Sequence, residues 1–265
     1  AGKRGVYWIA SLDLVASDIF LSTSYFDTRQ IQDMLYVYPK TLDTDEFKHA
    51  LRSLNGEVLS RRHLIEDPFE YRGIREYQAH DPERKISWKA SAKTGELKVL
   101  QNNYTSLKSV RVFIDITDNG VLKRTDAVEA CFMACMGVVS FFLSAGMQVS
   151  VYSNALDIFT GEPLRIREAS GIHHKDTVGM GLSRVSNEDC IDFNECLGEE
   201  ITQAGRDSFT IFITPNGYAE FMSLVQAYAE TGGGYVWYYM TKGRDEPEVL
   251  PALAEQTVFI HYKDI

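Results

Sequence analysis

Residues 109–152 read SVRVFIDITDNGVLKRTDAVEACFMACMGVVSFFLSAGMQVSVY. Two short apolar runs, 109–115 and 148–152, are typical of strands and flank the uncharged stretch Ala130–Met147. By length alone the uncharged stretch is a marginal transmembrane candidate. Its position between two strands favours instead a β-α-β unit whose helix is buried against a sheet.

The alternation of strand and helix continues to the end of the chain. We expect helices near 176–186, 194–204 and 218–231, and strands at 208–214, 234–240 and 257–262. This order predicts an α/β fold with a mostly parallel sheet and helices on both faces. We place this domain at residues 106–265.

The N-terminal part has a different pattern. Runs 5–15 and 34–38 are rich in strand-forming residues, so residues 1–42 are predicted to form a smaller all-β, sandwich-like region. A short helix is expected at 45–54, with Thr44 as N-cap and Gly56 beyond its end. Residues 43–105 are interpreted as a connecting segment.

Composition narrows the function classes. The formal net charge is -10 and the pI is about 5.1, which disfavours a general nucleic-acid binder because such binding relies on Lys and Arg. The four cysteines match no zinc or disulfide spacing, and Cys131 and Cys135 are expected on one buried helical face. The chain begins in polar Ala1–Arg4 without a signal peptide, so we expect a fragment of a longer protein.

The residues after the first predicted strand could bind a cation. Asp115, Thr117 and Asn119 stand at alternate positions and offer the oxygen ligands that Mg²⁺ and Mn²⁺ prefer. The ordinary interpretation, which we favour, is a turn in which Asp118, Asn119 and Gly120 satisfy backbone groups.

The other strand ends offer less. Residues 214–217 carry no carboxylate, and the loop before residue 176 carries Thr177, whose hydroxyl could be a ligand. His173 and His174 lack the neighbours of a zinc site. There is no Gly-x-Ser-x-Gly elbow for a nucleophile. The acidic run at 188–200 is interpreted as a solvated helix face, with a basic partner surface as the alternative.

Residues 67–97 mix Arg, Lys, Tyr and Trp. Arg75, Arg84, Trp88 and Lys89 could stack on and neutralise single-stranded nucleic acid. We favour the interpretation that these aromatic side chains anchor a linker to a domain, because the net charge of the whole chain disfavours nucleic-acid binding.

This stretch closely resembles the signature of a bacterial family labelled domain of unknown function 58. The start of the chain and residues 36–39 are also similar to the β-rich region that precedes this signature. The matching residues are Gly73, Arg75, Tyr77, Asp81, Pro82, Arg84, Ile86, Trp88, Lys89, Ala90, Ser91, Ala92, Thr94, Gly95 and Leu97.

The resemblance implies a von Willebrand factor A-like α/β domain after a sandwich-like region. It also implies an N-terminal pair of transmembrane helices, absent from this chain, that anchors the protein in the bacterial cell membrane with its soluble part facing the cytoplasm. Members are often encoded beside MoxR-type AAA+ ATPases. We therefore expect a protein partner, an AAA+ ATPase, and no nucleic acid.

The metal site of von Willebrand A domains is degenerate here. The family pattern is Asp-x-Ser-x-Ser, a Thr from a second loop and an Asp from a third. The corresponding residues are Asp115, Thr117, Asn119, Thr177 and Asn216. With one carboxylate, we expect no cofactor, or at most a weakly bound Mg²⁺ or Mn²⁺ ion.

A non-enzymatic interaction or assembly module is therefore the favoured function. The first alternative is a metal-dependent hydrolase that uses Asp115 with Asp118 or Asp176. The second is single-stranded nucleic-acid binding through the basic and aromatic residues of segment 67–97.

Overall fold

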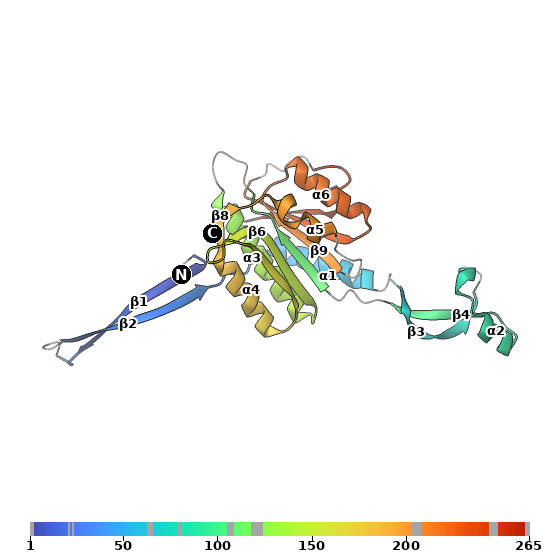
Figure 1. The fold of residues 1–265 in the computed structure, drawn as a ribbon, viewed down its shortest axis with the longest axis horizontal. Coiled ribbons are helices and arrows are strands. Elements are labelled where there is room, and N and C mark those ends of the chain that lie inside the picture. The colour runs from blue at the N-terminus through green and yellow to red at the C-terminus, as the bar shows by residue number, and fades with distance from the viewer. Residues whose placement is uncertain are drawn as a thin grey trace.

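The computed structural model describes residues 3–20, 22, 24–62, 66–78, 81–104, 109–117, 124–202, 208–243 and 249–262. An α/β body lies at the centre, and two arms project from opposite ends of it (Figure 1). One arm is the hairpin of β1 (Gly5–Ser17) and β2 (Ser24–Val37). The other holds β3 (Glu66–Glu76), β4 (Lys98–Tyr104), the short 3₁₀ turn η1 (Glu83–Lys85) and α2 (Trp88–Thr94).

The body contains a seven-stranded, mostly parallel sheet, as predicted. Its order is β11-β10-β9-β5-β6-β7, and β8 pairs with β6 beside this path. Two antiparallel partners of β6 were not expected from the sequence: β7 (Pro163–Ala169) and β8 (Val185–Cys190). The parallel strands are β5 (Ser109–Ile114), β6 (Gln148–Asp157), β9 (Ser208–Thr214), β10 (Gly234–Thr241) and β11 (Thr257–His261).

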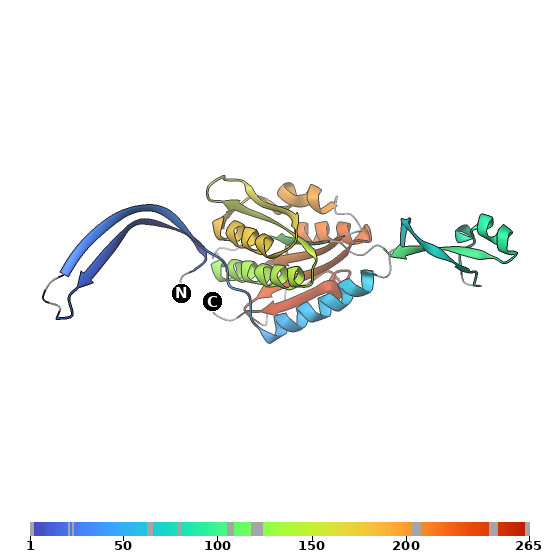
Figure 2. The ribbon, with the colours of Figure 1, turned by 90° about the horizontal axis from the view of Figure 1, so that it is seen from below.

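Helices cover both faces of this sheet, which confirms the predicted layering (Figure 2). Because side chains alternate along a strand, Val112 of β5 enters one core and Phe113 enters the other. The first core is covered by α1 (Asp45–Arg62), α3 (Thr125–Ser144) and α4 (Ile172–Arg184). The second is covered by α5 (Phe193–Thr202) and α6 (Ala219–Glu230), and η2 (Ala254–Gln256) precedes the last strand.

The central helix α3 holds most of the uncharged stretch, from Ala130 to its last residue, Ser144. Among the described helices, only α3 is long and apolar enough to cross a membrane, and 67% of its apolar window is buried inside the protein. Cys131 and Cys135 are both fully buried in the core beneath the sheet. The structure thus agrees with the predicted β-α-β unit.

The first helix belongs to the α/β body. Thr44 caps it as predicted, since its Oγ1 accepts a hydrogen bond of 3.3 Å from the Phe47 amide. The helix continues through Gly56 to Arg62, where the sequence indicated an end. Phe47 is buried in the first core. The centroid of its ring lies 6.0 Å from that of the Tyr238 ring, in an edge-to-face arrangement. The structure places α1 within the domain, whereas the sequence put residues 43–105 in a connecting segment.

The predicted sandwich-like region takes a simpler form. Within the described part of residues 1–42, β1 pairs with β2 in a single two-stranded sheet, and nearly all of its residues are exposed. A sandwich requires a second sheet packed on the first. The alternating pattern identified the strands, but such a pattern does not determine how many sheets pack together.

The described residues between Gly73 and Leu97 form a folded unit. Ser87 caps α2 through its hydroxyl oxygen, and Gly95 ends the helix in a left-handed conformation (φ 73°) that favours glycine. Arg75 donates hydrogen bonds to both carboxylate oxygens of Asp81, one of them 2.6 Å long. Trp88 is 68% exposed, so the anchoring role expected for it is wrong.

Candidate functional site

Asp115 follows the central strand β5 at the carboxyl edge of the sheet, where parallel α/β folds place their ligand sites. Its amide donates a hydrogen bond of 3.0 Å to the carbonyl of Ile213 on β9. The side chain is fully buried. The carboxyl group therefore lies between the ends of neighbouring strands.

Neutral donors surround this carboxyl group. Asp115 Oδ1 accepts hydrogen bonds from the Thr117 amide (2.9 Å) and from Asn154 Nδ2 (3.0 Å). The Thr214 hydroxyl lies 3.4 Å from Asp115 Oδ2. These donors come from the ends of β5, β6 and β9, so the carboxyl group ties three strands together.

The carboxamide of Asn154 is the centre of the cluster. Its Oδ1 accepts a hydrogen bond of 3.0 Å from the Ile116 amide. Besides Asp115, its Nδ2 lies 2.9 Å from Thr117 Oγ1 and 3.0 Å from the Ile191 carbonyl oxygen. An amide nitrogen carrying partial positive charge thus occupies a position among three oxygens that would otherwise suit a cation.

The third loop is fixed in the same way. Thr214 Oγ1 accepts a hydrogen bond of 3.1 Å from the Asn216 amide, and Asn216 Nδ2 donates to the carbonyl oxygen of Thr117. Arg124 donates to the Pro215 carbonyl oxygen (3.0 Å) and to Asn216 Oδ1. The loop after β9 is therefore held against the loop after β5.

Burial controls the acidity of the cluster. Burial raises the pKa of Asp115 above its ordinary value, and the hydrogen bonds that it accepts from Thr117 and Asn154 oppose that rise. The pKa of Tyr218 is raised by burial and by the neighbouring charge of Asp115. Burial also raises the pKa of Cys131 well above normal, with a smaller contribution from Asp115. The buried carboxyl group is therefore a weaker acid than a solvent-exposed aspartate.

Asp115→Asn is expected to stabilise the folded protein at neutral pH. Because the folded-state pKa is raised, the contribution of Asp115 to stability is greatest at low pH and is lost as pH rises through that pKa. The amide keeps an acceptor for Thr117 and Asn154 and never ionises. We expect a higher urea midpoint for the variant at about pH 8, with a difference that narrows toward about pH 4. A pH-independent difference, or a less stable variant at pH 8, would contradict the burial argument.

The predicted metal-site residues are only partly brought together. Asp115, Thr117 and Asn216 meet in the cluster, while Asn119 and Asp118 lie outside the described residues. Thr177 is exposed on α4, and its hydroxyl donates to the His173 carbonyl oxygen at 3.0 Å. The structure does not bring Thr177 to Asp115.

The antiparallel strand β7 explains the position of Thr177. This strand returns the chain to the amino edge of the sheet before α4 begins. There, buried His174 places its Nε2 2.7 Å from the carbonyl oxygen of Val149, at the start of β6. The helix start that carries Asp176 and Thr177 therefore lies at the edge opposite Asp115.

Three residues of the cluster were not identified from the sequence: Asn154, Thr214 and Tyr218. Asn154 carries the strongest missed signal, because an asparagine inside an apolar strand is unusual. Asp115, Thr117 and Thr214 could still offer oxygens to a metal ion. Within the described part of the cluster, the carboxylate that such an ion would meet is that of Asp115. The described residues of the cluster form a hydrogen-bonded junction between strand ends.

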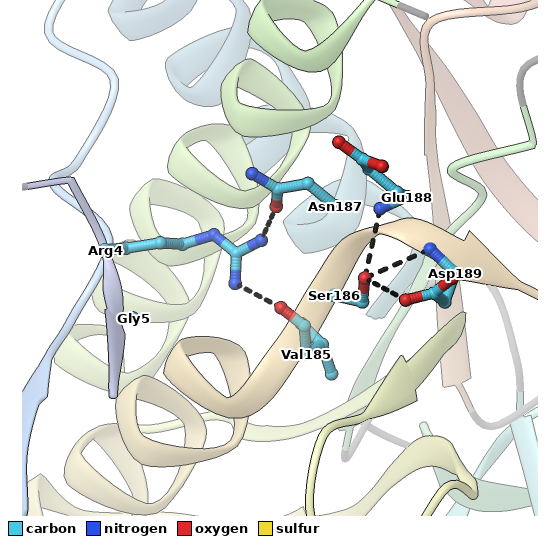
Figure 3. A pocket seen from close by; sticks show the side chains of 7 residues that line it. All are labelled: Arg4, Gly5, Val185, Ser186, Asn187, Glu188 and Asp189. Carbon is cyan, nitrogen blue, oxygen red and sulfur yellow. Dashed lines mark hydrogen bonds between the residues drawn. The ribbon is translucent and has the colours of Figure 1, made fainter. Parts of the chain in front are cut away.

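A second polar site surrounds Arg4, beside a cavity of about 310 Å³ lined by residues of β8 (Figure 3). The Arg4 side chain is 3% exposed and contacts Glu129 Oε2 at 2.8 Å and the Val185 carbonyl oxygen at 3.1 Å. It also donates to the Leu182 carbonyl oxygen and to Asn187 Oδ1. Burial lowers its pKa, and Glu129 opposes this shift. Arg4 therefore fastens the base of the hairpin to the α/β body.

Comparison with protein-family models and with curated proteins gives no relative. No protein-family model matches the sequence, and no curated protein matches it significantly. The geometry of the carboxyl edge and of the arms therefore carries the functional argument.

Proposed function

We propose that the α/β body is a von Willebrand factor A-like domain that acts as a non-enzymatic interaction and assembly module. Its binding surface would be the edge surface, defined as Thr117, Arg124 and residues 216–219, which end at Ala219, the first residue of α6. The central parallel strands and the position of Asp115 after β5 support this assignment.

The observation that carries the proposal is the internal closure of the cluster by Asn154. The side-chain amide of Asn154 donates to oxygens of Asp115, Thr117 and Ile191. Asn216 and Arg124 hold the loop after β9 in place. A rigid surface loses little conformational freedom when a partner binds. A hydrolase built on Asp115 and Asp176 is disfavoured because Asp176 lies on α4, which begins at the opposite edge of the sheet.

The proposed partner is a MoxR-type AAA+ ATPase. This choice rests on the resemblance carried by the signature between Gly73 and Leu97, which forms the β3–β4–α2 arm. The same resemblance supports a location at the bacterial membrane, with this part of the protein facing the cytoplasm. In that setting the module would present client proteins to the ATPase or transmit its force to them.

Ala219→Arg tests the edge surface in the full-length protein. Ala219 is exposed at the start of α6, and an arginine there would obstruct a docked partner without entering the core. The matched control is Ala227→Arg, also exposed and two turns further along α6. We expect affinity purification from the producing cells to recover an AAA+ ATPase, identified by mass spectrometry, with wild type and control.

Recovery with Ala219→Arg should fall about tenfold or more, as expected when a bulky charge enters an interface. Equal recovery with both variants would remove the edge surface from the proposal. Purification of wild type without any AAA+ ATPase would contradict the proposed partner.

A further inference from the structure

The net negative charge of the chain comes entirely from residues 106–265. Residues 106–265 hold 22 acidic and 12 basic side chains, which accounts for the whole net charge of -10. Residues 1–105 hold 15 of each and are neutral overall. The whole-chain charge therefore does not describe the local charge of the arms.

The tip of the β3–β4–α2 arm carries exposed cations beside an exposed tryptophan. Lys89 and Lys93 lie one helical turn apart on α2, Arg84 lies on η1, and Trp88 begins α2 with 68% of its surface exposed. We call these four residues the α2 face. In contrast, Lys98 of the same arm is paired with Glu96 at 3.0 Å.

Within the described residues, Arg84, Lys89 and Lys93 form no ion pair. Tryptophan and arginine side chains that are exposed in the free protein are enriched at the centres of protein interfaces. The α2 face is therefore suited to an acidic surface with an apolar centre.

The body of the same protein has such a surface. Asp189, Asp192, Glu195 and Glu199 are all exposed on β8, α5 and the turn between them, and we call them the acidic face. Ile191, 42% exposed, lies among them in the sequence and could receive the Trp88 ring. Glu195 and Glu199 are spaced one helical turn apart, as are Lys89 and Lys93.

These two faces cannot meet within one molecule. The α2 face is at the tip of one arm, while β8 lies on the far side of the body from that arm (Figure 1). The view turned by 90° shows the same separation (Figure 2). Contact between them requires a second copy of the chain.

We infer that the α2 face of one copy docks on the acidic face of a second copy. Because the two faces differ, the contact is heterologous and repeats head to tail, giving rings or filaments. Opposite charges would steer and align the copies, and the buried Trp88 would supply apolar contact. This self-association uses β8 and α5 and does not depend on the AAA+ partner or on the edge surface proposed above.

A charge-swap experiment tests this contact. One variant, Lys89→Glu with Lys93→Glu, reverses the α2 face, and the other, Glu195→Lys with Glu199→Lys, reverses the acidic face. Sedimentation velocity at about 50 mM salt should show self-association of the wild type that weakens at about 0.5 M, where screening is strong. Each variant alone should associate roughly tenfold or more weakly.

An equimolar mixture of the two variants should regain association, because each reversed face then meets its complement. The control, Glu220→Lys with Glu230→Lys, changes the charge by the same amount as Glu195→Lys with Glu199→Lys, but at exposed positions of α6. This control should associate as the wild type does. Circular dichroism melting verifies that every variant is folded.

Three results would overturn the inference. The first is a wild type that stays monomeric at low salt, and the second is association that survives reversal of the α2 face. The third is a mixture that fails to associate although both variants are folded. Binding of an oligothymidine strand by a monomeric wild type, lost in Lys89→Glu with Lys93→Glu, would assign the α2 face to nucleic acid instead.

Discussion

Arg4→Met is expected to lower the free energy of unfolding by about 3 kcal/mol, as measured by urea denaturation. The substitution leaves the Glu129 carboxylate, 18% exposed, without its partner at 2.8 Å. It also removes donors from the carbonyl oxygens of Leu182 and Val185 and a guanidinium that lies 3.9 Å above the Phe132 ring. Breaking a buried pair by removing one member is costly because the other charge remains buried.

Two variants separate the pair from general charge effects. Lys3→Met removes the same charge from an exposed neighbour and should change stability by less than about 0.5 kcal/mol. Arg4→Met combined with Glu129→Gln should be more stable than Arg4→Met alone, because the amide carries no charge. Equal effects of Arg4→Met and Lys3→Met would show that Arg4 does not fasten the hairpin to the body.

Phe47→Ala should destabilise the protein by about 3–5 kcal/mol, the usual cost of deleting a buried phenylalanine. Phe47 is 1% exposed and packs edge-to-face on Tyr238. It also fits against Gly137 of α3, where an added Cβ would lie 2.6 Å from the Phe47 ring. Chemical denaturation of the purified chain measures this loss.

The matched control is Arg52→Ala, an exposed change on the same helix, which should cost less than about 0.5 kcal/mol. If Phe47→Ala cost no more than Arg52→Ala, α1 would not belong to the core of the α/β body. Residues 43–62 would then be the connecting segment that the sequence suggested.

Periodicity predicted most of the α/β body because apolar runs there are long and well separated. The strand at 208–214 has the predicted bounds, and α3 includes residues 130–144 of the stretch predicted as a buried helix. In contrast, β7 alternates apolar with charged residues on an edge of the sheet and gives a weak signal. Because β7 was not predicted, Thr177 was expected beside Asp115 at the carboxyl edge of the sheet. The structure places it at the amino edge.

Contacts between distant residues account for the other differences. Asn154 was not identified because its three oxygen partners lie on two other loops, one after β5 and one after β8. The extension of α1 beyond Gly56 is stabilised by burial of Val58 in the core, which helix propensity alone does not reveal. The exposure of Trp88 was not predicted, because the interpretation of residues 67–97 relied on the net charge of the whole chain. That net charge comes from the acidic body and does not describe the cations of the arm.

The central claim is that the edge surface binds protein without help from a metal ion. Its most direct test is quantitative recovery of the AAA+ ATPase by full-length Asp115→Asn, Ala219→Arg and Ala227→Arg, purified in parallel from the producing cells. We predict wild-type recovery with Asp115→Asn and Ala227→Arg and a loss of about tenfold or more with Ala219→Arg. Loss of AAA+ ATPase recovery with a folded Asp115→Asn variant would contradict the claim.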